Sequence, residues 1–426
     1  MTSRAPILWL ALLAATPVVA QTSSTTPAPI APPVAVPAAD PVFTTCMTTL
    51  RGIAEKQGVT TASFDTYTKD LIADMSVLDL LDAQPEFTTP LWDYLAALVD
   101  DQRVADGQAM LTTHAELLGR VSQAYGVDPA TVVAVWGVES DYGRVFGKRP
   151  LLVSLSTLSC FGRRQTFFRG EFLTTLKLLQ AGDVRAEGLN GSWAGAFGHT
   201  QFMPSTYERI AVDFDGDGRR NLIDSIPDAL ASTANYLVKS GWRTGEPWGY
   251  EVKLPAGVDI AQAGRTSRKP LTQWVTQGLT RIDGQPLPAD DRNAAVLVPT
   301  GIAGPAFVVF KNYDAIYSYN AAESYALAIA LLADRLRGGG GLVATWPTDD
   351  PGIGRPQRRE LQTLLLARGH AIGAVDGMIG TQTRRAIVIE QQRLGLQPAD
   401  GRAGTKILAA LKADGPPVAV PETSQP

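Results

Sequence analysis

The chain has 426 residues, which is room for two or three domains with a sizeable core. Its apolar fraction of 45% is ordinary for a folded soluble protein, and its charged fraction of 19% is slightly low. The formal net charge is only −4 and no long basic run occurs. The composition therefore argues against nucleic acid as a partner, because neutralising a phosphate backbone requires clustered Lys and Arg.

The first 20 residues read as a signal peptide. Arg4 supplies the positive start, residues 7–15 are apolar, and small residues precede a cut before Gln21. A membrane anchor is the alternative, but this apolar run is too short to span a bilayer. The residue directly after the cut is Gln21 and not Cys, so no lipid anchor is expected. We therefore expect a periplasmic protein, exported without a stable membrane anchor.

Residues 21–40 are rich in Pro, Ala, Ser and Thr with no apolar pattern to bury, which predicts an extended linker. From 41 to 337 helical periodicity dominates, which predicts a mainly α domain. Between 249 and 310 the chain is richer in Pro, Gly and Val, which favours a small β or loop insertion. The clearest predicted helices cover 112–125, 130–139, 169–181, 228–240 and 322–337, and the clearest strands 250–254 and 306–310.

A second linker, 338–356, leads to a small unit at 357–413, and residues 414–426 are expected to form a disordered tail. The small unit contains an internal echo, because DGMIGT at 376–381 is matched by DGRAGT at 400–405. Each copy predicts a turn that opens a helix. This three-helix plan resembles the peptidoglycan-binding domain that is appended to many cell-wall hydrolases. A generic small helical domain is the alternative.

The sharpest functional signal is an acid at the end of an apolar helix. Residues 132–138 are apolar almost without a break, and Glu139 follows them near the helix end that Gly143 marks. Apolar surroundings and the negative end of the helix would both raise the pKa of this carboxyl. A carboxyl that stays protonated near neutral pH can protonate a leaving oxygen. A solvent-exposed glutamate at a helix end is the alternative.

The string VWGVESDYGR, residues 135–144, resembles the catalytic-helix motif of B-type lytic transglycosylases, whose domain resembles lysozyme. The resemblance extends over almost all of residues 43–337. Its further blocks are QPEF at 84–87, PLWDYL at 90–95, GSWAGAFGHTQFMPS at 191–205, ANYL at 234–237 and YN at 319–320.

This resemblance implies a mainly α fold, with a lysozyme-like transglycosylase domain that contains a small β or loop insertion. A C-terminal three-helix peptidoglycan-binding domain would follow it. The resemblance assigns the role of acid and base to Glu139. The residues that it implies for binding the glycan are Tyr94, Ser192, Gln201, Tyr319, Asn320 and Tyr325.

Ordinary glycosidases use two carboxylates, but no second acid stands in a sequence setting comparable to that of Glu139. The resemblance implies that Glu139 protonates the oxygen between MurNAc and GlcNAc and then deprotonates the sugar's C6 hydroxyl, which closes a 1,6-anhydro ring. Residue spacing does not separate this lyase from a muramidase that uses Glu139 with water. A non-catalytic scaffold that binds peptidoglycan is a third reading. In each case the partner is the peptidoglycan glycan strand, and we expect a monomer.

Residues 213–224 fit the twelve-residue EF-hand loop, with Gly218 at the sharp turn. Asp224 stands where a longer Glu is usual, which would weaken binding. The loop predicts a Ca²⁺ site with a structural role, since the chemistry itself requires no cofactor. An Asp/Gly loop that binds nothing is the alternative. The predicted ligands are Asp213, Asp215, Asp217, the Arg219 carbonyl and Asp224.

Cys46 and Cys160 are the only cysteines in the chain. In an exported protein an isolated pair favours a disulfide, and two buried free thiols are the alternative. The three histidines are scattered and give neither a metal-ligand spacing nor a triad. Zinc-dependent amidase or peptidase chemistry is therefore disfavoured.

Overall fold

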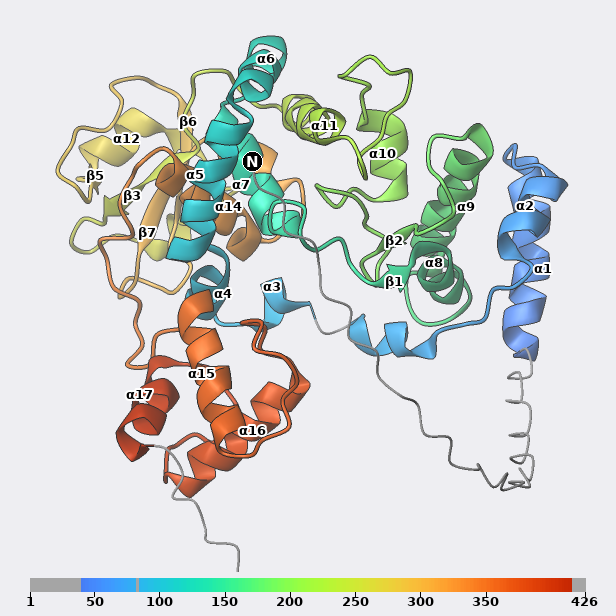
Figure 1. Ribbon diagram of the computed structural model, residues 1–426. Coiled ribbons are helices and arrows are strands. Elements are labelled where there is room, and N and C mark those ends of the chain that lie inside the picture. The colour runs from blue at the N-terminus through green and yellow to red at the C-terminus, as the bar shows by residue number, and fades with distance from the viewer. Residues whose placement is uncertain (1–39, 82–83, 416–426) are drawn as a thin grey trace, which may run out of the picture. The chain divides into compact units, whose positions relative to one another are not determined.

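The computed structural model describes residues 40–81 and 84–415 (Figure 1). The predicted signal peptide, and almost all of the first linker and the tail, lie outside these residues. The described part contains 17 α-helices and 7 short strands, so the mainly α class predicted from periodicity is confirmed. None of the described helices is both long enough and apolar enough to cross a membrane.

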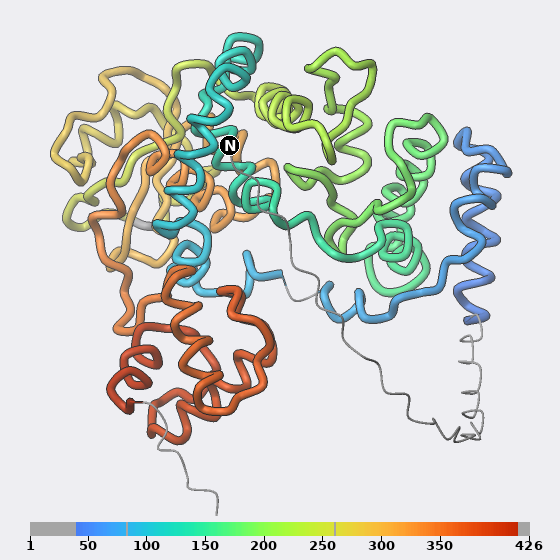
Figure 2. The backbone as a smooth tube through the Cα atoms, in the orientation of Figure 1, coloured from blue at the N-terminus to red at the C-terminus, as the bar shows by residue number. Residues whose placement is uncertain are grey.

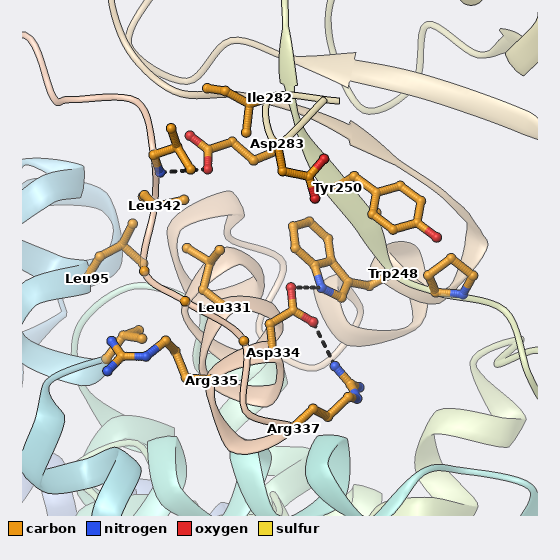
Figure 3. A pocket seen from close by; sticks show the side chains of 18 of the residues that line it. Leu95, Trp248, Tyr250, Ile282, Asp283, Leu331, Asp334, Arg335, Arg337 and Leu342 are labelled. Carbon is orange, nitrogen blue, oxygen red and sulfur yellow. Dashed lines mark hydrogen bonds and ion pairs between the residues drawn. The ribbon is translucent and has the colours of Figure 1, made fainter. Parts of the chain in front are cut away.

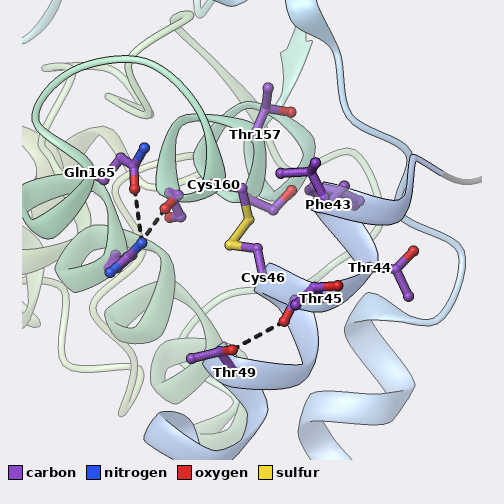
Figure 4. The surroundings of a disulfide bond; sticks show 12 residues. Phe43, Thr44, Thr45, Cys46, Thr49, Thr157, Cys160 and Gln165 are labelled. Atoms are coloured by element: carbon purple, nitrogen blue, oxygen red, sulfur yellow. Dashed lines mark hydrogen bonds between the residues drawn. A yellow bond between two sulfur atoms is a disulfide. The ribbon is translucent and has the colours of Figure 1, made fainter.

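One group of helices packs around the fully buried rings of Phe168, Phe172 and Tyr207. Within it α1 lies against α8, while α2 and α10 lie against α9 (Figure 1, Figure 2). A disulfide between Cys46 of α1 and Cys160 of α8 ties the start of the fold to this core (Figure 4). The elements are α1 (Pro41–Lys56), α2 (Thr61–Thr68), the 3-10 helix η1 (Met75–Leu80), α8 (Leu151–Cys160), α9 (Gln165–Ala181) and α10 (Pro204–Ile210).

A second group surrounds α7 (Pro129–Ser140), in which every residue from Ala130 to Gly137 is buried. Helix α14 (Glu323–Leu336) packs along α7, and α5 contacts both of them. Because α7 is enclosed on all sides, its last turn has a fixed position in the domain. The other helices of this group are α3 (Pro85–Thr88), α4 (Leu91–Leu98), α5 (Asp101–Thr113), α6 (Ala115–Tyr125), α11 (Ile226–Lys239) and α13 (Lys311–Tyr317).

The predicted β insertion contains a five-stranded antiparallel sheet in the order β4-β6-β7-β3-β5. Alternate residues of its central strand point to opposite faces. Phe307 and Val309 join the core around α7, while Val308 packs with α12 on the other face. The elements are β3 (Gly249–Lys253), η2 (Ile260–Gln262), β4 (Lys269–Pro270), α12 (Leu271–Thr276), β5 (Thr280–Arg281), β6 (Asn293–Leu297) and β7 (Ala306–Val309), with a separate pair β1 (Arg149–Pro150) and β2 (Asn190–Gly191).

The C-terminal unit is a three-helix domain, as the repeated turns predict. Its helices, α15 (Arg355–Ala367), α16 (Thr381–Arg393) and α17 (Thr405–Asp414), enclose Leu361, Ile387 and Leu411. Helix α15 begins two residues before the predicted boundary at 357.

The predicted helix 112–125 is two helices in the structure, because His114 leaves helical geometry with φ −108° and ψ 24° between α5 and α6. The apolar pattern runs across this break, so periodicity alone does not locate it. The other four predicted helices correspond to α7, α9, α11 and α14, with ends that differ by up to four residues.

Candidate active site

The helix that carries Glu139 is defined at both ends by local chemistry. Asp128 caps its start, where its carboxylate accepts a hydrogen bond from the Thr131 amide at 3.1 Å, and Pro129 occupies the first turn. Asp141 ends the helix in a left-handed conformation with φ 52°. Glu139 therefore stands in the last turn, as the sequence indicates.

Glu139 is partly exposed, but most of its surroundings are protein. The hydroxyl of Tyr325, on α14, donates a hydrogen bond to its Oε1. Desolvation raises the pKa of Glu139 to about 8; the Tyr325 bond opposes this rise and the charge of Glu86 adds to it. This carboxyl can therefore hold a proton at neutral pH, give it away, and take one back.

Glu86, on α3, is a carboxylate whose importance the sequence analysis missed. Its Oε1 accepts hydrogen bonds from Asn320 at 3.2 Å and from Gln84 at 3.3 Å. Its charge raises the pKa of both Glu139 and Tyr94, although burial is the main cause at each. The QPEF block marked this residue as part of a motif, but nothing in the sequence placed it near Glu139.

Stacked tyrosines form one side of the site. The rings of Tyr319 and Tyr325 are 6.3 Å apart and tilted by 22°. The Tyr319 hydroxyl donates to the carbonyl of Thr200 at 2.8 Å, and its ring lies 4.6 Å from that of Tyr236. Burial raises the pKa of Tyr319 and Tyr325 well above the usual range, so both stay neutral and serve as hydrogen-bond donors.

The loop that carries Ser192 and Gln201 bonds mainly to itself. The Ser192 hydroxyl accepts a hydrogen bond from the Ala196 amide at 3.0 Å. The Gln201 amide donates to the carbonyl of Gly198 at 2.8 Å and to that of Phe146 at 3.3 Å. These bonds hold the two side chains in place without a partner from α7.

His199 connects this loop to α7. Its Nδ1 lies 3.1 Å from the indole Nε1 of Trp136 and its carbonyl accepts the Ser140 hydroxyl at 2.5 Å. Burial lowers the pKa of His199 to about 4, so the ring is neutral and its Nδ1 accepts the indole proton. This histidine therefore has a structural role that its isolated place in the sequence did not reveal.

The structure thus brings Glu139, Tyr325 and Tyr319 into a contiguous chain of contacts. Asn320 bonds to Glu86, whose charge acts on Glu139. Tyr94 is coupled to both carboxylates through their charges. No direct bond joins Ser192 or Gln201 to Glu139 among the described residues.

The predicted calcium loop gathers three acids. One carboxylate oxygen from each of Asp213, Asp215 and Asp217 lies within 4.8 Å of the others, and all three residues are exposed. Asp228 fixes the shape of the loop. Its fully buried carboxylate accepts hydrogen bonds from the amides of Phe214 and Asn221 at 2.7 and 2.8 Å. The oxygen donors and the turn suit a hard divalent cation.

Asp224 is not part of that group of three. One of its carboxylate oxygens instead accepts a hydrogen bond from Arg185 at 2.8 Å. The side chain at the last position of the loop thus pairs with the Arg185 guanidinium, and the predicted calcium ligands that come together are those of the first half of the loop.

The structure also contains a pocket of about 1320 Å³ (Figure 3). It is lined on one side by Leu95 of α4 and Leu331 of α14, and on another by the linker around Leu342. Asp334 faces it and accepts the indole proton of Trp248 at 2.9 Å. Neither Glu139 nor any predicted glycan-binding residue lines this pocket.

Comparisons with known proteins agree with this geometry. Residues 42–334 match the family model described as the transglycosylase SLT domain, and residues 354–411 match a putative peptidoglycan binding domain. Membrane-bound lytic murein transglycosylase B of Escherichia coli K12 is 34% identical over 279 residues, which are 60% of this chain and 72% of that protein.

Two solved relatives cover more of the architecture. SltB3 from Pseudomonas aeruginosa, in complex with NAG-anhNAM-pentapeptide, shares 48% identity at a TM-score of 0.70 over 87% of this chain and 99% of its own. The Escherichia coli transglycosylase Slt35, in complex with calcium, shares 32% identity at a TM-score of 0.60 over 70% of this chain and 94% of its own. The chain therefore belongs to the SLT-domain lytic transglycosylases, enzymes that act on peptidoglycan, and carries a peptidoglycan-binding domain at its C-terminus.

Proposed function

We propose that this enzyme cleaves the β-1,4 bond between MurNAc and GlcNAc and leaves 1,6-anhydroMurNAc ends, with Glu139 as acid and then base. One observation carries the proposal: Glu139 is held by Tyr325 in surroundings that raise its pKa to about 8. An ordinary carboxyl would be ionised at neutral pH and could not begin the reaction.

The reaction balances with one carboxyl group. Glu139 gives its proton to the glycosidic oxygen as the bond from that oxygen to C1 of MurNAc breaks. The N-acetyl oxygen of MurNAc stabilises the electron-poor carbon. The Glu139 carboxylate then removes the proton from the C6 hydroxyl, whose oxygen bonds to C1 and closes the anhydro ring. The carboxyl regains its proton and no water is consumed.

We assign glycan binding to the polar and aromatic side chains around Glu139. Tyrosine rings offer apolar faces to sugar rings, while amides and hydroxyls bond to sugar hydroxyls and N-acetyl groups. The relative solved with NAG-anhNAM-pentapeptide supports both this class of ligand and the anhydro product. The proposed binding residues are Tyr94, Ser192, Gln201, Tyr319, Asn320 and Tyr325.

Mass spectrometry of digested sacculi tests this proposal. We expect new MurNAc ends in the anhydro form, lighter by one water than hydrolysed ends. Ends in the hydrated, reducible form would instead identify a muramidase that uses the same Glu139. Binding to sacculi without release of any fragment would identify a scaffold.

The pH dependence of catalysis should respond in opposite directions to two substitutions. Glu139 must be protonated to act, so activity should fall as pH rises through its pKa. Tyr325→Phe removes a bond that lowers this pKa, so the alkaline limb of kcat/KM should move upward. Glu86→Gln removes a charge that raises the pKa, so the limb should move downward. Each shift should be roughly one pH unit or less, and equal profiles would contradict the assignment of this limb to Glu139.

We propose that Asp213, Asp215 and Asp217 bind Ca²⁺ as a structural ion, together with the carbonyl of Arg219. The separation of their carboxylates and the calcium complex of the relative Slt35 support this assignment. We include Asp224 as a ligand that would have to leave Arg185.

Calcium at 100 times its Kd should stabilise the folded enzyme by about 2.7 kcal/mol. Thermal unfolding with Ca²⁺ and with a chelator measures this difference, and Asp213→Asn should remove most of it. Equal melting temperatures in Ca²⁺ and chelator would show that the loop is structural without a metal.

We also propose that residues 1–20 direct export to the periplasm and are then removed. Sequencing the N-terminus of the protein recovered from the periplasm should give Gln21 as its first residue. An intact Met1 on the periplasmic or membrane-bound protein would contradict cleavage.

A further inference from the structure

The C-terminal domain contacts the catalytic domain at the end of α7 and in the first turn of α4, and Figure 1 shows α15 next to α4. We propose that it is a positioning part of that site, in addition to any role in holding the wall. Arg355 holds Asp141 at the end of the helix that carries Glu139, and Arg402 holds Asp93 beside Tyr94. The inference rests on the proposed role of Glu139.

The first contact is a two-bond pair between Arg355 and Asp141. The two guanidinium nitrogens of Arg355 each lie 2.9 Å from a different carboxylate oxygen of Asp141. The side chains are only 12% and 15% exposed. Paired bonds between charged groups are among the strongest in proteins and fix geometry as well as distance. Arg355, from α15, thus makes the shortest of the ion pairs that hold the Asp141 side chain, because Arg144 of the catalytic domain is 3.5 Å from it.

The position of Asp141 matters to α7. Its backbone is left-handed, with φ 52°, a conformation that is uncommon outside glycine, although Asp adopts it more readily than most residues. Its amide donates to the Gly137 carbonyl at 3.1 Å, one turn before the end of the helix. The guanidinium of Arg103 also donates to the Gly137 carbonyl and lies 3.7 Å from Asp141. Arg355 completes a network that closes the helix two residues after Glu139.

The second contact joins Arg402 to α4. Its guanidinium donates to the two carboxylate oxygens of Asp93 at 2.6 and 2.7 Å, and it also pairs with Asp350 in the linker. Asp93 is in the first turn of α4, next to Tyr94. The linker itself lies close to this helix, because a Cβ on Gly352 would be 2.9 Å from the Cα of Asp93.

The two copies of the internal repeat differ at the position of Arg402. Both turns are built alike: the amides of Gly377 and Gly401 donate to Gln362 and Gln391 at 2.7 and 2.8 Å. The next residue differs. In the first turn it is a methionine with 66% of its surface exposed, and in the second it is Arg402, which the catalytic domain covers. The first turn therefore faces solvent, and the second contacts the catalytic domain.

Steady-state kinetics of the full-length enzyme on short, soluble, peptide-free glycan strands tests this inference. Such strands measure catalysis without attachment to the wall. We expect Arg355→Gln to lower kcat about tenfold with little change in KM, because the acid is displaced while binding residues remain. Arg402→Gln should raise KM more than it lowers kcat, since it acts through α4 and Tyr94. Arg355→Lys should recover part of the loss.

Arg51→Gln is the matched control, because Arg51 makes the same two-bond pair with Asp65 at 2.7 Å, but on the exposed surface of α1 and α2. It should leave kcat and KM unchanged. If Arg355 acts through Asp141, adding Arg355→Gln to Asp141→Asn should cause little further loss.

Sacculus binding and melting temperature, measured on the same variants, report whether each protein is folded. A folded Arg355→Gln enzyme with wild-type kcat on soluble strands would overturn the inference and leave the domain as a tether. The inference would also be overturned if the fall in kcat of the double variant equalled the product of the two single falls, because Arg355 would then act independently of Asp141. Glu139→Gln in the same assay tests the underlying function separately: if it stays active, the proposed acid is wrong whatever Arg355 does.

Discussion

Glu139→Gln should lower the rate of sacculus digestion by at least roughly 10³-fold, since one group supplies both proton transfers. Glutamine has nearly the same shape and can keep the contact with Tyr325, so the fold and glycan binding should persist. It has no proton to give to a leaving oxygen and no basic oxygen for the C6 hydroxyl. Turbidity loss of purified sacculi, followed together with binding to sacculi, measures both properties at once.

Glu116→Gln is a suitable control, because Glu116 is an exposed glutamate in the first turn of α6. It should digest sacculi at the wild-type rate. A Glu139→Gln enzyme that keeps more than a few per cent of wild-type activity would mean that another group supplies the proton. Glu86 would then be the first residue to test.

Of the changes proposed for this protein, removal of the disulfide should lower the free energy of unfolding most. The bond joins Cys46 and Cys160 across 114 residues and connects α1 to the buried end of α8 (Figure 4). Closing a loop of that length restricts the unfolded chain by about 4 to 5 kcal/mol in the entropic description. Cys46→Ser with Cys160→Ser should lower the denaturant midpoint correspondingly, since α1 would lose its covalent link to the core.

Reduction of the wild type provides the control for this substitution. A thiol reductant should shift the wild-type midpoint toward that of the double variant and leave the double variant unchanged. A wild-type midpoint that does not respond to complete reduction, confirmed by thiol counting, would contradict a stabilising role for this bond.

The part of the site that is local in sequence could be predicted from it. The apolar run, the acid and the helix end lie within twelve residues of one another, and the resemblance of this one string to a known catalytic motif identified Glu139 as the candidate acid. The same holds for Asp213, Asp215 and Asp217, whose spacing is that of a single loop. In each case the chemistry follows from neighbours along the chain.

The long-range contacts could not be predicted in this way. Glu86 lies near Glu139 only because α3 packs against α14. Asn320, which bonds to Glu86, is 234 residues away from Glu86 in the sequence. Arg402 and Asp93 are 309 residues apart. The repeat DGRAGT identified a turn, but whether its arginine faces solvent or another domain depends on packing that periodicity does not contain.

Digestion of sacculi in H₂¹⁸O tests the central claim most directly, because lyase chemistry takes no oxygen from water. Mass spectrometry should find 1,6-anhydroMurNAc ends without ¹⁸O from the wild type, and no new ends from Glu139→Gln. One ¹⁸O on each new MurNAc end would show that water, and not the C6 hydroxyl, attacks the sugar.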